Sequence, residues 1–181
     1  MIIEPKKIES KNLTMVIRCP NKSDAAQLSE LRIKIDSETE NLDREPGEDI
    51  LTGEDFEKLI YNDSVAEKNI FLVVETEGKL VGFARCQGNE LARFRHKAEF
   101  GIGILKEYWG YGIGKIVLEN ILLWADSEGI EKICLAVVET NTKAIGLYKK
   151  FGFVEEGLLI KDRIHRDGNY YNTVMMRRLK N

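Results

Sequence analysis

The segment "AEFGIGILKEYWGYGIGKIVL" (98–118) constrains the fold more than any other part of the chain. A strand-like run over 98–105 leads into a glycine-rich loop, and a helical pattern follows from about 111 to 127. A second apolar run, 132–138, lacks polar alternation and is typical of a buried strand. A strand, a helix and a strand in this order predict a parallel pair of strands inside a mixed sheet.

The flanking segments add mostly antiparallel elements. Strand-like runs occur at 13–18, twice within the hairpin pattern 69–88, and at 153–164 and 171–179. Helices are expected after Ser23 and Asp24, after Thr52 and from Asn141. The order β α α β β β α β α β β indicates an α/β (α+β) fold with about seven strands in a twisted, mostly antiparallel sheet. Residues 1–11 are read as a loose arm or an added strand. The length predicts a single domain over 1–181.

Composition and charge exclude several classes of function. The chain is 43% hydrophobic and 31% charged, with a net charge of -3, so it has no basic excess for binding a phosphate backbone. Glu4 and Pro5 stand where a signal peptide needs apolar residues, and the apolar region 116–125 is too short to span a bilayer. We expect no nucleic-acid partner and no membrane association.

The cysteine and histidine residues form no metal or disulfide pattern. Cys19, Cys86 and Cys134 are far apart and odd in number, which favours reduced thiols in a cytoplasmic protein. His96 and His165 are isolated, so no metal site is expected.

The loop "YWGYGIGK" (108–115) precedes a helix, and unpaired N–H groups at a helix start bind anions. A P-loop is excluded because Trp109 replaces its first glycine and Ile116 replaces its magnesium-binding hydroxyl residue. A Rossmann site fits poorly because the spacing is G-x-G-x-G and only one strand–helix–strand unit exists. The remaining alternatives are a bare turn and a pyrophosphate held by backbone amides.

The preceding strand supports the pyrophosphate alternative. In "EFGIGIL" (99–105), Glu99, Gly101 and Gly103 alternate on one face, and two glycines there leave the backbone open to a ligand.

The segments "GIGILKEYWGYGIGKIVLENIL" and "LAVVETNTKAIGLYKKFGFVEEG" together resemble the GNAT superfamily of acetyl-CoA-dependent N-acetyltransferases, over about residues 98–157. The family signature of Arg or Gln, two residues, Gly, one residue and Gly or Ala falls on Trp109, Gly112 and Gly114, with Trp in place of the Arg or Gln. The C-terminal "HRDGNYYNTVMMRRL" is similar to bacterial members that acetylate amino acids, small amines or protein N-termini.

The resemblance implies acetyl-CoA as cosubstrate, with no metal. It assigns the pyrophosphate to the amides of residues 110–115, namely Gly110, Tyr111, Gly112, Ile113, Gly114 and Lys115. It places the pantetheine arm between splayed central parallel strands, along the backbone of Ile102, Gly103 and Ile104, and adds Asn141 at the next helix start.

Two side chains are candidates for proton transfer. The resemblance assigns Tyr148, two helical turns after Asn141, as the acid that protonates the departing thiolate, whereas spacing alone favours a core tyrosine. Glu99 on the glycine face is the candidate base and would act directly or through a water. Glu139 is the rival candidate for this role. Alternatively, Glu99 is a solvent-exposed carboxylate without a catalytic role. The backbone N–H of Ile104 is the expected oxyanion donor.

These features predict transfer of an acetyl group from acetyl-CoA to a primary amine by direct attack in a ternary complex. The amine is an amino acid, a small amine or polyamine, or a protein N-terminus, and the protein is monomeric or a homodimer. Acidic residues dominate segment 36–57, which is either a rim that attracts a cationic amine or a solvated loop. The alternative function is a non-catalytic CoA-binding sensor or interaction module with the same fold.

Overall fold

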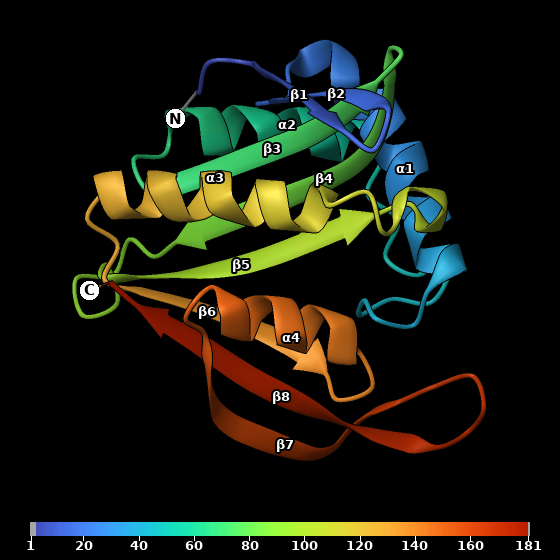
Figure 1. The fold of residues 1–181 in the computed structure, drawn as a ribbon, viewed down its shortest axis with the longest axis vertical. Coiled ribbons are helices and arrows are strands. Elements are labelled where there is room, and N and C mark those ends of the chain that lie inside the picture. The colour runs from blue at the N-terminus through green and yellow to red at the C-terminus, as the bar shows by residue number, and fades with distance from the viewer. Residues whose placement is uncertain (1–2, 181) are drawn as a thin grey trace.

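The computed structural model describes residues 3–180, which form one eight-stranded sheet (Figure 1). The strands, in chain order, are β1 (Lys6–Ser10), β2 (Leu13–Arg18), β3 (Asn69–Thr76), β4 (Lys79–Gly88), β5 (Lys97–Ile104), β6 (Lys132–Val138), β7 (Val154–Ile164) and β8 (Tyr170–Leu179). Their order across the sheet is β1-β2-β3-β4-β5-β6-β8-β7, and only β5 and β6 are parallel. The predicted mixed, mostly antiparallel α/β fold is confirmed.

Four helices cover the two faces of the sheet, α1 (Ala25–Glu38), α2 (Gly53–Val65), α3 (Ile113–Ser127) and α4 (Thr142–Lys150). Strand β5 shows which helix lies on which face. Its Phe100 ring makes an edge contact with Tyr148 of α4, whereas a Cβ on Gly103 would meet Ile35 of α1. Successive side chains of a strand point to opposite faces, so α3 and α4 cover one face and α1 and α2 the other (Figure 1). We call these the front and the back face.

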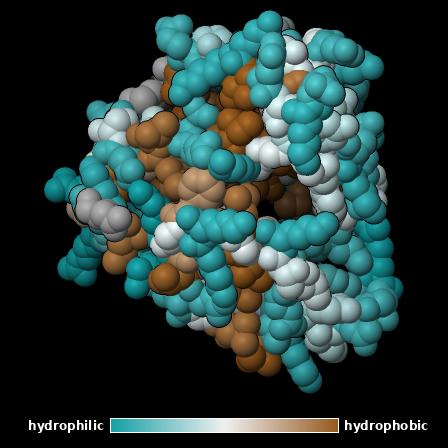
Figure 2. Space-filling view, in the orientation of Figure 1, coloured by the Kyte–Doolittle hydropathy of each residue, from teal (hydrophilic) through white to brown (hydrophobic). Residues whose placement is uncertain are grey.

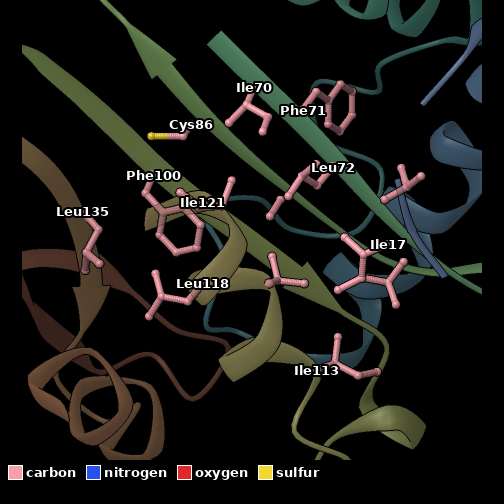
Figure 3. Close-up of a cluster of buried hydrophobic side chains, with 14 of the residues drawn as sticks. Ile17, Ile70, Phe71, Leu72, Cys86, Phe100, Ile113, Leu118, Ile121 and Leu135 are labelled. Carbon is pink, nitrogen blue, oxygen red and sulfur yellow. The ribbon is translucent and has the colours of Figure 1, made fainter. Parts of the chain in front are cut away.

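The front-face core fixes α3 above β3, β4 and β5. Figure 3 shows Ile113, Leu118 and Ile121 of α3 directed at the strands, where Leu72 and Phe100 meet them. These three side chains of α3, Ile113, Leu118 and Ile121, are at most 1% exposed. Burial of each such side chain stabilises by roughly 1.5–3 kcal/mol, so the start of α3 is held firmly in place.

The structure differs from the sequence predictions in three details. Eight strands are present because β1 adds to the edge of the sheet, which makes the beginning of the chain an added strand rather than a loose arm. Helix α3 begins at Ile113, later than predicted, because Gly112 is left-handed. Asn21 caps a short turn over Lys22–Asp24 before α1, while the Asp24 carboxylate binds Arg18 at 2.7 Å instead of capping the helix.

Other predicted boundaries are confirmed. The Thr52 side chain accepts the N–H of Asp55 in a capping box that begins α2. Asn141 caps α4. The single domain over 1–181 stays a prediction, and its residues 1, 2 and 181 lie outside the described part. In residues 3–180, no helix combines the length and apolar character needed to cross a membrane.

The central parallel strands separate soon after they meet. β5 and β6 pair only between Lys97–Glu99 and Lys132–Cys134, and β6 then continues alongside β8 as far as Val138. The C-terminal half of β5 therefore has a strand neighbour only on the β4 side.

Candidate active site

The free edge of β5 presents a defined set of backbone groups. The His96 C=O accepts the N–H of Lys132 on the β6 side, and the Leu105 N–H donates to Val81 on the β4 side. Because the register between β4 and β5 is unbroken, the backbone groups of successive β5 residues point alternately toward β4 and toward the β6 side. The N–H and C=O groups of Ile102 and Ile104 thus face the gap, whereas those of Gly103 face β4.

A deep hollow opens beside this edge. Figure 2 shows it with apolar walls, at the place where Figure 1 has the end of β5, the start of α3 and α4. A Cβ on Gly114 would lie 3.6 Å from Leu147 and 3.8 Å from Ile104, which are ordinary contact distances, so the packing of the protein does not require a glycine here.

The glycines of the loop have two different causes. Gly110 and Gly112 have φ values of +85° and +81°, a left-handed conformation that other residues adopt only with strain. The turn itself therefore requires both glycines, as the bare-turn alternative supposed. Gly114 lies inside α3 and outside this region of φ, so the turn does not explain it.

The first turn of α3 is suited to an anion. No side chain caps it and it contains no acidic residue, so the N–H groups of Ile113, Gly114 and Lys115 have no partner within the helix. The Lys115 side chain is turned toward Glu119, 3.6 Å away, one turn further on. The exposed amides and the helix dipole together make this end of the hollow electropositive.

Trp109, which stands where the family signature has Arg or Gln, connects the loop to β5. Its indole N–H donates to the C=O of Ile104 at 2.8 Å, so it fixes the loop against the free edge of the strand. Sequence reasoning missed this contact, because it depends on the path of the intervening turn.

Tyr148 and Asn141 lie on the front face. The Asn141 Oδ1 accepts the Ala144 N–H at 3.3 Å, which occupies its oxygen as a helix cap and leaves its NH₂ group for other partners. Tyr148 is 8% exposed and its ring packs against Phe100 and Phe153. Burial raises the pKa of Tyr148 to about 12, so the phenol stays protonated at neutral pH.

Glu99 and Glu139 have different environments. The Glu139 carboxylate accepts both the N–H and the side-chain amide of Asn172, at 2.9 and 3.0 Å, and so holds β8. Glu99 is exposed on the back face, at the last position where β5 pairs with β6. Its neighbours on that face, Gly101 and Ala136, are also exposed. The carboxylate and the Tyr148 phenol thus lie on opposite faces of the sheet at the start of the gap.

Many acidic side chains of segment 36–57 are ion-paired or hydrogen-bonded. Arg163 and Arg166, which lie in and just after β7, pair with Asp43 and Glu45 at 3.1 and 2.7 Å. Further acidic side chains of the segment are held by cations or backbone amides, namely Asp36, Glu38, Glu40, Asp49, Asp55 and Glu57. The two arginines lie about 120 residues from their partners, so sequence reasoning missed them. The solvated, ion-paired loop fits this arrangement better than an open anionic rim.

No group of three or more His, Cys, Asp or Glu residues within 3–180 could hold a metal ion.

Comparisons with known proteins define the class. Residues 35–153 match the model of the acetyltransferase (GNAT) family. The chain is 29% identical to the acetyltransferase of GNAT family from Streptococcus pneumoniae, with a TM-score of 0.88 over 92% of this chain and 99% of that one. An acetyltransferase from Salmonella typhimurium, solved with acetyl-CoA, shares the fold at 18% identity, with a TM-score of 0.80 over 91% of this chain and 93% of that one. The chain belongs to the GNAT acetyltransferase family.

Curated relatives differ in the amine that their names specify. An L-amino acid N-acetyltransferase of Escherichia coli (strain K12) is 30% identical over 60% of this chain and 67% of its own length. A spermidine N(1)-acetyltransferase of Vibrio cholerae is 32% identical over 60% of this chain and 65% of its own length. A ribosomal protein bS18-alanine N-acetyltransferase of Haemophilus influenzae is 29% identical over 61% of this chain and 72% of its own length.

The two causes of the glycine pattern predict opposite effects on stability. Gly110→Ala and Gly112→Ala should each lower the free energy of unfolding by about 1–2 kcal/mol, because alanine is strained at these φ values. Gly114→Ala should leave it unchanged or raise it by up to about 1 kcal/mol, since alanine favours the helix and its contacts are ordinary. Denaturant unfolding measures all three, and equal losses would contradict the assignment.

Proposed function

We propose that this protein transfers the acetyl group of acetyl-CoA to a primary amine by direct attack in a ternary complex. The observation that carries the proposal is the free edge of β5, which joins an apolar hollow to an uncapped helix start. A CoA thioester has the matching parts, an anionic pyrophosphate, a pantetheine arm with amide groups and an acetyl thioester. The Ile102 N–H and C=O suit the amides of the arm, and the amides of residues 110–115 suit the pyrophosphate.

The two faces of the sheet divide the chemistry. On the back face, Glu99 takes a proton from the amine, directly or through a water, as the nitrogen attacks the thioester carbonyl carbon. A β5 N–H facing the gap, that of Ile104, stabilises the oxyanion. The C–S bond then breaks, and Tyr148 on the front face donates its proton to the thiolate. The acetyl group ends on nitrogen, and CoA leaves as the thiol.

The site favours an α-amino group over a polyamine. An α-amino group has a pKa near ~8, so it requires less of the exposed Glu99 than an alkyl ammonium of pKa near ~10. The ion pairs of segment 36–57 offset part of its negative charge and so weaken its attraction for a second ammonium group. We therefore propose a free amino acid or a peptide N-terminus as the acceptor.

The direct test measures acetyl-CoA binding by calorimetry and thiol release with amino acids, an alanine-terminated peptide and spermidine. Binding with release for at least one α-amine supports the proposal. Binding without release for any amine would favour the CoA-binding sensor, and absence of binding would rule out both.

Gly114 provides a steric test of the donor site. Gly114→Leu should raise the dissociation constant of acetyl-CoA at least tenfold, about 1.4 kcal/mol, because the side chain extends into the hollow toward Leu147 and Ile104. Gly114→Ala is the matched control and should stay within about threefold, because its Cβ makes only ordinary contacts. If the leucine variant binds like the parent, the arm does not pass through this hollow.

Tyr148→Phe isolates the hydroxyl, since the ring packing is retained. We expect kcat to fall by up to about 10²-fold with acetyl-CoA affinity nearly unchanged. Because the pKa of Tyr148 is raised to about 12, the acid form persists throughout an assay range of about pH 6–10. The parent pH profile should therefore rise as the amine loses its proton and show no tyrosine-dependent decline in that range. A decline near pH 9 that disappears in Tyr148→Phe would contradict this assignment.

Salt dependence tests the ion-paired acidic segment. The kcat/KM values for spermidine and for an amino acid should fall nearly in parallel between low and high ionic strength, because the ion pairs weaken the attraction of the segment for a polycation. The triple change Glu45→Gln, Glu48→Gln and Asp49→Asn serves as the comparison and should leave this parallel unchanged. If kcat/KM for spermidine falls with salt by a factor more than about tenfold greater than that for the amino acid, the segment is an anionic rim and a polyamine is the favoured acceptor.

A further inference from the structure

The β1–β2 hairpin contacts the anion-binding loop directly, although it is about 100 residues away in sequence. The Ser10 Oγ donates to the C=O of Tyr111 at 2.7 Å, and the Lys11 Nζ donates to the C=O of Gly110 at 2.6 Å. Figure 1 shows the blue hairpin next to the yellow loop that leads into α3. Ser10 and Lys11 lie outside the segments that carry the family resemblance, whereas their partners in the loop lie inside them.

The hairpin has a fixed geometry. Its two turn residues, Lys11 and Asn12, are both left-handed, with φ values of +48° and +65°, as a two-residue hairpin turn requires. At the other end of β1, the Lys6 Nζ donates to the Oδ1 of the buried Asn120 in α3 at 2.6 Å. The strand is therefore attached to α3 at one end and to the loop at the other.

The contacts determine where the loop amides point. In a planar trans peptide the C=O and the following N–H point in opposite directions, and no cis peptide is present in the described residues. The Gly110 and Tyr111 carbonyls point at the hairpin, so the N–H groups of Tyr111 and Gly112 point away from it.

We propose that Ser10 and Lys11 are positioning residues of the donor site, which orient the loop amides for the CoA pyrophosphate. The inference rests on the proposed acetyl-CoA site. Neither side chain touches the reacting atoms. Without them, the two peptides of the loop are free to rotate, and part of the ordering is left to the moment of binding. The Lys11 ammonium also places one positive charge beside the loop.

The test uses the variants Ser10→Ala and Lys11→Met, singly and together, with calorimetry of CoA. Each loses one hydrogen bond, so we expect a rise in dissociation constant of about three- to tenfold for each, and at least tenfold for the pair. Ser10→Thr and Lys11→Arg retain a donor and should restore most of the affinity. The effect of Ser10→Ala should persist at high salt, because that residue carries no charge.

Lys68→Met is the matched control. Lys68 is a partly exposed lysine whose Nζ also donates to a loop carbonyl, that of Arg95 at 2.9 Å, but at the opposite end of β4. It should bind CoA like the parent. All variants should unfold at the parent's temperature within a few degrees, which separates an effect on binding from a loss of folding.

Kinetics and a second ligand distinguish orientation from other roles. With saturating acetyl-CoA, kcat and the KM for the amine should match the parent, while the KM for acetyl-CoA rises. The affinity for dephospho-CoA, which lacks the 3′-phosphate, should fall by the same factor as the affinity for CoA. A loss seen only with CoA would mean that Lys11 contacts the 3′-phosphate, which overturns the orienting role.

Unchanged affinity in the double variant would overturn the inference while leaving the proposed function intact. A parent protein that does not bind CoA would remove the proposed function itself, so the two failures are distinguishable.

Discussion

The early separation of β5 and β6 is the constraint on which the site depends. After Glu99 and Cys134 the two strands no longer pair, and the β5 backbone faces an apolar hollow instead of a neighbouring strand. Helix α3 packs against the N-terminal half of the sheet, while β6 continues with β8. An edge of this kind favours any ligand that supplies matching amide groups.

Side-chain alternation along β5 places the proposed base and the proposed acid on different faces. Alternation along β5 directs Glu99 and Gly101 to the back and Phe100 to the front, where the ring meets Tyr148. Phe100 helps to bury the phenol and so contributes to its raised pKa, whereas Glu99 stays in contact with solvent. A thioester placed in the gap would have a proton acceptor on one side and a proton donor on the other.

The sequence predicted what depends on neighbouring residues. Capping by Thr52 and Asn141 and the positions of the central strands follow from local patterns, and the structure has them within a residue or two. Contacts between distant segments were not predictable, because residue type alone does not select a partner. Arg166 could have met any carboxylate, and only the path of β7 and β8 brings it to Glu45. The cause of the glycines at Gly110 and Gly112 was also hidden, since a left-handed turn and a close ligand leave the same residue type.

The contacts that hold the centre of the loop use the Trp109 side chain and the Gly110 and Tyr111 carbonyls, and none of them uses the N–H groups of residues 110–112. Trp109 donates to Ile104 at the start of the loop, while the hairpin donates to Gly110 and Tyr111 further on. A loop fixed through donated N–H bonds would have used the groups that an anion needs. A replacement of the signature Arg or Gln by Trp is compatible with this scheme, because the indole contributes to the position of the loop rather than to its charge. The ordering of the loop is then complete before a ligand arrives, and less of the binding free energy is spent on it.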